Sequence, residues 1–247
     1  MDTAAKDPKE RLCLALDVPS MAEVGAIVRE LSGMVGMFKV GLELFTSAGP
    51  EVIRLIRSLG GRVFVDLKFH DIPNTVARAT RSIVRMDVAM LNVHASGGTD
   101  MMKAAAEASR DEATKEGLAL PSVVAVTVLT SISESTLRDE IGISTPVNEQ
   151  VVALARLAQL SGLDGVVASP KETALIRHAC GRPFLIVTPG IRPIGSDPGD
   201  QRRFTTPAEA ILFGADYIVV GRPILAAQDR TRACEKILTE VRSVMDA

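Results

Sequence analysis

Eight short apolar runs rich in β-branched residues recur along the 247 residues, and segments with helical spacing separate them. Each run is short enough to be a buried parallel strand. Strict alternation of strand and helix, without a linker, predicts a parallel sheet closed by its own helices, an α/β fold of the TIM (β/α)8-barrel type. The runs span residues 12–18, 38–42, 63–68, 90–95, 123–129, 165–169, 185–189 and 217–221.

The competing arrangement is an open, doubly wound sheet. Such a sheet is expected to carry a glycine-rich dinucleotide turn after its first strand. The first run here ends instead in Asp17-Val-Pro-Ser20. We therefore expect a single (β/α)8-barrel catalytic domain over residues 1–247, in which residues 1–10 form a loose, polar N-terminal extension.

Charge and cysteine usage restrict the partners and the compartment. The net charge is −2 and the charged residues are spread along the chain, so we expect neither nucleic acid nor a membrane surface as a partner. Cys13, Cys180 and Cys234 are far apart and outside any metal-binding spacing. We expect a cytoplasmic protein without disulfides, and no required metal, because no two histidines have metal-ligand spacing either.

Charged residues interrupt the apolar runs near their ends. Asp17 ends the first run, Lys39 lies in the second, and Asp66 and Lys68 end the third. In a barrel of this type the carboxyl ends of the strands form the active-site face. Because side chains alternate with period two, Asp66 and Lys68 are predicted to share the face of Phe64 and to lie side by side.

Asp71 follows the third run by three residues, and Lys39 on the neighbouring strand completes an alternating set of Lys39, Asp66, Lys68 and Asp71. A lone buried charge would cost roughly several kcal/mol, so these groups need one another as partners. Such an array would hold Lys68 protonated and aimed at one spot, as a general acid for a developing carbanion requires. The alternative is an ion-pair network that only ties strands together; Asp17 and Lys39 on adjacent strand ends favour the catalytic interpretation.

Two features near the C-terminus predict a phosphate site. Gly221 and Arg222 lead from the eighth run into a proline-started helix, where backbone amides and the guanidinium would cradle a phosphate. The alternative is a plain strand-to-helix turn with an exposed arginine. The long segment 189–204, broken by glycine and proline, is either a closing lid whose Arg192 and Gln201 reach the phosphate or an ordinary loop. His94, at the end of the fourth run, is interpreted as packing behind the site.

Several blocks of sequence, in this order, resemble the shorter, bacterial-type orotidine 5′-phosphate decarboxylases over nearly the whole chain. The segment D-x-K-x-x-D-I-P-N-T is the most specific of them. The blocks are residues 14–17, 38–41, 66–75, 93–95, 188–193 and 219–224.

The resemblance implies a cofactor-free enzyme that converts orotidine 5′-phosphate to UMP and CO2, the final step of de novo pyrimidine nucleotide biosynthesis. Lys68 would protonate carbon 6, with Asp66 and Asp71 orienting its ammonium group. The binding roles that the resemblance implies are Asp17 and Lys39 at the ribose hydroxyls, with Asp66 beside them, Thr130 at the pyrimidine, and Arg192, Gln201, Gly221 and Arg222 at the phosphate.

The resemblance also implies a homodimer, in which Asp71 and Thr75 reach into the site of the partner subunit. Two other functions are compatible with the pattern. A sugar-phosphate decarboxylase or hexulose-phosphate synthase of the same superfamily also carries D-x-K-x-x-D, but needs magnesium. A barrel without activity that binds nucleotides and regulates a partner is the other, although Asp66, Lys68 and Asp71 are all present.

Overall fold

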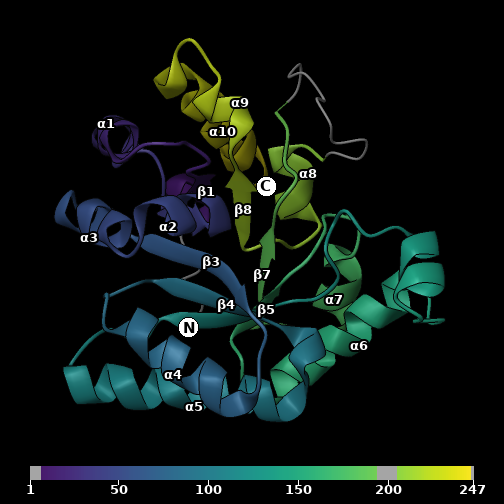
Figure 1. Cartoon of the computed structure of the whole chain (residues 1–247). Coiled ribbons are helices and arrows are strands. Elements are labelled where there is room, and N and C mark those ends of the chain that lie inside the picture. The colour runs from purple at the N-terminus through teal and green to yellow at the C-terminus, as the bar shows by residue number, and fades with distance from the viewer. Residues whose placement is uncertain (1–6, 194–204, 246–247) are drawn as a thin grey trace.

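The computed structural model describes residues 7–193 and 205–245, in which eight parallel strands close into a barrel in sequence order (Figure 1). This confirms the predicted TIM (β/α)8 fold. Six of the strands are shorter than the predicted runs, and in β1, β5 and β6 the difference is at least two residues, because the last residues of those runs belong to loops. The strands are β1 (Leu12–Ala15), β2 (Met37–Gly41), β3 (Val63–Phe69), β4 (Met90–His94), β5 (Ser122–Val126), β6 (Gly165–Val167), β7 (Leu185–Thr188) and β8 (Tyr217–Val220).

Helices surround the barrel, as Figure 1 shows. They are α1 (Met21–Leu31), α2 (Leu42–Ala48), α3 (Glu51–Ser58), α4 (Pro73–Val84), α5 (Gly98–Glu116), α6 (Val147–Leu160), α7 (Thr173–Cys180), α8 (Pro207–Leu212), α9 (Arg222–Leu225) and α10 (Arg230–Met245). Single turns at Pro8–Arg11 (η1), Ala95–Gly97 (η2) and Thr136–Glu140 (η3) complete the described elements. None of the helices in the described ranges is long and apolar enough to cross a membrane.

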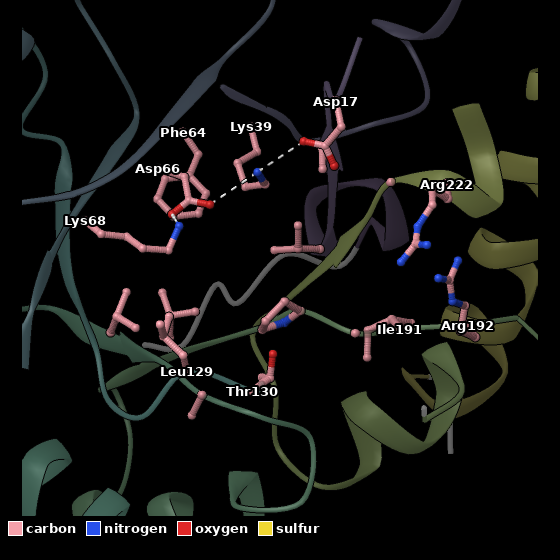
Figure 2. Close-up of a pocket in the computed structure, with 18 of the residues that line it drawn as sticks. Asp17, Lys39, Phe64, Asp66, Lys68, Leu129, Thr130, Ile191, Arg192 and Arg222 are labelled. Atoms are coloured by element: carbon pink, nitrogen blue, oxygen red, sulfur yellow. Dashed lines mark hydrogen bonds and ion pairs between the residues drawn. The ribbon is translucent and has the colours of Figure 1, made fainter. Parts of the chain in front are cut away.

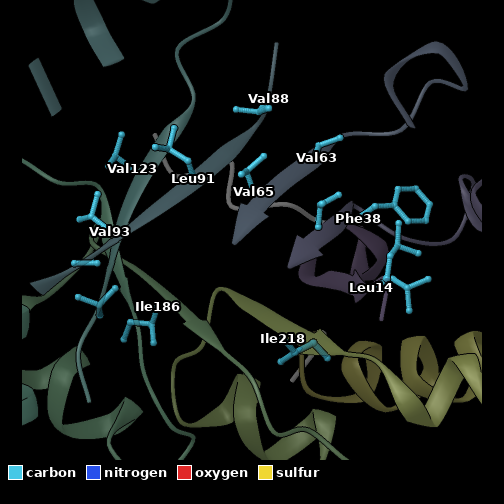
Figure 3. Packing of buried hydrophobic residues seen from close by; sticks show 14 of the residues in the cluster. Leu14, Phe38, Val63, Val65, Val88, Leu91, Val93, Val123, Ile186 and Ile218 are labelled. Carbon is cyan, nitrogen blue, oxygen red and sulfur yellow. The ribbon is translucent and has the colours of Figure 1, made fainter. Parts of the chain in front are cut away.

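Two apolar layers follow from the alternation of side chains along the strands. The outer layer packs between strands and helices and includes Leu14, Phe38, Val65, Leu91 and Ile218 (Figure 3). The inner layer fills the barrel and consists of Cys13, Ala15, Met37, Phe64, Met90, Val124, Val187 and Val219. Because this layer occupies the barrel interior, space for a ligand remains only beyond it, at the carboxyl ends of the strands.

Residues 7–10 differ from the predicted loose extension. They enter the turn η1, in which Pro8 is buried and the Asp7 carboxylate accepts the Lys9 backbone N–H at 3.1 Å. Glu10 forms an ion pair with Arg62, 2.9 Å from oxygen to nitrogen. η1 contacts β8 and α10, so this part of the chain packs against the barrel; polar composition alone did not reveal those partners.

Candidate active site

A cavity of about 280 Å³ opens at the carboxyl ends of the strands (Figure 2). Its walls come from segments far apart in the sequence, because the closed sheet brings all eight strand ends to one rim. The cavity therefore lies on the predicted face of the barrel. Predicted site residues that line it are Asp17, Lys39, Asp66, Lys68, Thr130, Arg192, Gly221 and Arg222.

An array of alternating charges crosses one side of this cavity. The Asp66 carboxylate lies between two ammonium groups: Oδ1 is 2.7 Å from Lys68 Nζ, and Oδ2 is 3.2 Å from Lys39 Nζ. Lys39 Nζ is also 3.8 Å from Asp17 Oδ1. Figure 2 shows the chain of contacts from Lys68 to Asp17. The structure thus brings together four of the residues that the sequence grouped.

Asp66 is the most enclosed acid of this array, with a side chain only 13% exposed. Burial by itself raises the pKa of its carboxyl group, but the charges of Lys39 and Lys68 and the hydrogen bonds from Lys68 and Asn92 outweigh it, and the pKa is lowered. The carboxylate therefore stays ionised at neutral pH and offers one oxygen to each lysine.

The backbone at Lys68 departs from the regular strand that the sequence predicted. Lys68 has φ +54°, a left-handed conformation that costs a non-glycine residue of order 1–3 kcal/mol. The register between β3 and β4 shifts between Val65 and Phe69, which marks a bulge. The bulge re-aims the side chain, and Lys68 still meets Asp66 as period two predicted.

Asn92 on β4 is a site residue that the sequence reasoning missed. Its amide contacts both Asp66 and the backbone of Lys68, and its side chain is buried. A signal was available, because Asn92 lies two residues after Met90 and two before His94 and so points into the barrel with them.

Two predicted residues that the structure describes do not line this cavity. Asp71 and Thr75 are exposed around the start of α4, and Asp71 Oδ1 accepts the Ile72 backbone N–H at 2.7 Å. Within the part of the chain described here, Asp71 forms no ion pair with Lys68, so the predicted set of four is not completed by one chain. Gln201 lies outside the described residues.

Two guanidinium groups lie at the opposite end of the cavity from Lys68. Arg192 follows β7, and Arg222 begins α9 directly after β8. Figure 2 shows both heads on the same side of the cavity, well away from Asp66. Gly221 precedes Arg222 in the cavity wall, and a Cβ there would crowd β1 and the segment after it, 3.3 Å from Asp17 Oδ2 and 3.4 Å from the Ala15 side chain. This end suits a dianion.

The wall between the two charged ends is mostly apolar. Leu129 and Ile191 face the cavity there, with the hydroxyl of Thr130 nearby (Figure 2). Val126, Val167 and Pro189 extend the apolar surface. A flat, partly polar ring fits such a wall, with charged groups available at both of its ends.

His94 lies behind the charged array. Its ring centroid is 5.4 Å from that of His70, and the two rings are tilted. Burial lowers the pKa of His94 below its ordinary 6.5, and the charges of His70 and Lys68 lower it further, against the opposing effect of Asp66. A neutral imidazole at neutral pH fits the predicted packing role better than proton transfer.

Within residues 7–193 and 205–245, no three histidine, cysteine, aspartate or glutamate side chains are grouped so as to hold a metal ion. The described side chains with a positive charge that line the cavity are Lys39, Lys68, Arg192 and Arg222.

Comparison with known proteins identifies close relatives. The family model described as "Orotidine 5′-phosphate decarboxylase / HUMPS family" matches residues 10–237. Orotidine 5′-phosphate decarboxylase of Moorella thermoacetica is 56% identical over 236 residues, covering 96% of this chain and 94% of that protein. The enzyme of the same name from Syntrophotalea carbinolica is 52% identical over 240 residues, covering 97% and 98%. The crystal structure of orotidine 5′-phosphate decarboxylase from Lactobacillus acidophilus superimposes with a TM-score of 0.83 at 40% identity, covering 93% of this chain and 98% of that one.

The lowered pKa of His94 predicts a pH-dependent stability. Above pH 6.5 the ring is neutral in both the folded and the unfolded chain; as the pH falls, the unfolded chain takes up the proton first, and stability is lost until the folded pKa is reached. The melting temperature of the parent should therefore fall more between about pH 7.5 and about pH 5.5 than that of His94→Gln. His178→Gln, at an exposed position, should follow the parent. Equal pH dependence of parent and His94→Gln would contradict this prediction.

Proposed function

Because the chain belongs to the orotidine 5′-phosphate decarboxylase / HUMPS family, we propose that it converts orotidine 5′-phosphate to UMP and CO2, as the last step of pyrimidine nucleotide synthesis. The relatives compared above are named orotidine 5′-phosphate decarboxylases, and the chain is an enzyme of that carboxy-lyase class. One observation supports this cavity as the site of the reaction. The Asp66 carboxylate lies between two ammonium groups at one end, two guanidinium groups lie at the other end, and an apolar wall separates the two ends.

The substrate would span the cavity from end to end. Its phosphate binds Arg192 and Arg222 beside Gly221, where Gln201 is the further phosphate ligand implied by the resemblance. The ribose hydroxyls bind Asp17 and Lys39, which lie between the two ends. The pyrimidine then rests on the apolar wall near Thr130, and its carbon 6 faces Lys68. This orientation matches each charged group of the substrate with a group of opposite charge or a hydrogen-bond partner.

Chemistry at carbon 6 determines what Lys68 must do. The bond between carbon 6 and the carboxylate breaks, CO2 leaves, and the electron pair remains on carbon 6 in the plane of the ring, where the π system does not delocalise it. The Lys68 ammonium stabilises this pair and donates its proton, forming the new C–H bond of UMP; the neutral amine then regains a proton from water. Barriers of this kind are lowered by roughly 20 kcal/mol in the most demanding enzymes, so electrostatic stabilisation at carbon 6 is indispensable.

Asp66 and Lys39 serve this step by position. Asp66 accepts from Lys68 at 2.7 Å and fixes the direction of its ammonium group. The ammonium group of Lys39 lies 3.2 Å from the other carboxylate oxygen, Asp66 Oδ2, so both oxygens of Asp66 face a positive charge. Preorganised charges of this kind need no rearrangement when the carbanion forms.

We further propose a homodimer in which Asp71 and Thr75 complete the site of the partner subunit. Both residues are exposed around the start of α4, and the apolar side chain of Ile72 beside them is 67% exposed. A two-fold contact at this surface would cover Ile72 and carry each Asp71 towards the Lys68 of the other chain.

The whole chain, residues 1–247, is proposed to form one catalytic domain that works without a cofactor in the cytoplasm. The three cysteines are free thiols, as suits a reducing compartment. Independence from magnesium distinguishes this proposal from the related sugar-phosphate enzymes considered above.

Replacement of Lys68 by alanine tests the proposed chemistry. Purified parent protein should convert orotidine 5′-phosphate in the presence of EDTA, followed by the loss of ultraviolet absorbance. Lys68→Ala should lose at least about 10³-fold in kcat, since both the stabilising charge and the proton donor are gone. Lys103→Ala, at an exposed position on α5, should keep parental activity. Loss of parental turnover in EDTA, or substantial turnover by Lys68→Ala, would refute the proposal.

Mixing of two inactive variants tests the shared site. Lys68→Ala and Asp71→Ala should each be nearly inactive alone. In an equal mixture after subunit exchange, about half of the dimers are mixed, and each mixed dimer has one intact site of two, so about a quarter of the parental activity should return. Exchange is checked by native mass spectrometry. A mixture that exchanges subunits but stays inactive, or an Asp71→Ala variant that is active alone, contradicts the shared site.

A further inference from the structure

The side-chain amide of Asn92 on β4 forms hydrogen bonds through both its nitrogen and its oxygen to residues of the charged array. The side chain is 1% exposed and points into the barrel. Its Nδ2 donates to Asp66 Oδ1 at 2.7 Å, and its Oδ1 accepts the backbone N–H of Lys68 at 2.8 Å. A buried amide with both ends paired is a rigid link, because rotation about its terminal bond would break both hydrogen bonds at once.

The hydrogen bond from the Lys68 backbone to Asn92 Oδ1 replaces a missing part of the sheet. Val65 pairs with Leu91 and Phe69 pairs with Val93, so Asn92 alone stands opposite the bulged residues 66–68 of β3. The bulge leaves the Lys68 N–H without a backbone partner on β4, and this N–H donates to the side-chain oxygen of Asn92 instead. This bond stabilises the left-handed backbone at Lys68, where φ is +54°.

The hydrogen bond from Asn92 Nδ2 sets the orientation of the Asp66 carboxylate. Asp66 Oδ1 accepts from both Asn92 Nδ2 and Lys68 Nζ, each at 2.7 Å, while Oδ2 faces Lys39. An N–H donor on Oδ1 therefore keeps this oxygen on the side of Lys68. Without that donor, the carboxylate is free to turn its oxygens between the two lysines.

We propose that Asn92 is a positioning residue for Lys68: one amide fixes both the backbone from which the proton donor extends and the carboxylate that aims its ammonium group. This inference rests on the proposed function, because it assigns Asn92 a part in proton transfer to carbon 6. Asn92 does not itself touch the substrate in this assignment. Its effect should appear in kcat and leave nucleotide affinity nearly unchanged.

Substitution by aspartate separates the two ends of the amide. An ionised carboxylate at position 92 still accepts the Lys68 N–H, but it donates nothing to Asp66 and repels it at hydrogen-bonding distance. When protonated, the same group donates an O–H to Asp66 much as the amide does. The other titratable or charged groups around position 92 come from three strands: Lys39 from β2, Asp66 and Lys68 from β3 with His70 directly after it, and His94 from β4. The strand β5 places only valines opposite Asn92 and His94.

The test compares Asn92→Asp and Asn92→Leu with two controls. Asn148→Asp adds one negative charge at an exposed position on α6. Thr127→Val removes another buried side-chain hydrogen bond at the end of β5, from the hydroxyl to the Val167 carbonyl at 3.1 Å. For each protein we would measure the melting temperature, the Kd for UMP, and kcat from about pH 5 to about pH 8.

The expected result is a loss in kcat at nearly constant binding. Asn92→Leu should lose about 10²-fold in kcat, the size of effect that a displacement of about 1 Å produces, while the Kd for UMP stays within about 3-fold. For Asn92→Asp, the ratio of its kcat to that of the parent should rise as the pH falls. Both controls should have the kcat of the parent and its dependence on pH, even if the melting temperature of Thr127→Val is lower.

Three outcomes would overturn the inference: an Asn92→Leu variant with parental kcat, an Asn92→Asp ratio that is flat across the pH range, or the same kcat loss in Thr127→Val. If Asn92→Leu does not fold, the pH dependence of Asn92→Asp decides alone. A parent that does not convert orotidine 5′-phosphate would instead contradict the proposed function, and so the two failures are distinguishable.

Discussion

The rest of the site depends on one carboxylate, Asp66, held between the ammonium groups of Lys39 and Lys68. Each of these charges alone would cost several kcal/mol, roughly, to enclose at the barrel mouth; together they compensate one another. The sheet enforces the arrangement, because Lys39 pairs in register with Phe64, one inward position below Asp66. Phe64 in turn fills the barrel beneath the charges and leaves them on the floor of the cavity.

A regular strand would not serve this site. β3 bulges before Phe69, and Lys68 is held in a left-handed conformation, so the strained residue is the one to which we assign the proton transfer. Asn92 lies opposite the bulge, and its Oδ1 accepts the Lys68 backbone N–H, which has no partner in the sheet. A hydrogen bond from the neighbouring strand thus offsets the backbone strain at Lys68. Because both residues lie on strands of the barrel, the position of the proton donor is held fixed.

The sequence predicted the features that depend on periodicity. Eight strands, the inward side of Asp66 and Lys68, and the gathering of Arg192 and Arg222 at one cavity follow from alternation and from the closed sheet. The features it missed depend on single contacts. Neither the left-handed backbone at Lys68 nor the packing of residues 7–10 can be predicted from the spacing of apolar residues. Asp71 is close to Lys68 in sequence, but the two form no ion pair within one chain, because β3 ends at Phe69 and the Asp71 carboxylate accepts the Ile72 backbone N–H just before α4.

Proton transfer from Lys68 to carbon 6 is tested most directly by the reverse reaction on the product. A group that protonates the carbanion must also remove the proton from carbon 6 of UMP, so the enzyme in D2O should exchange that hydrogen for deuterium. Proton NMR of UMP follows the exchange. We predict loss of the carbon 6 signal with the parent protein and none with Lys68→Ala; equal exchange by both proteins, or no exchange by the parent, would contradict the role assigned to Lys68.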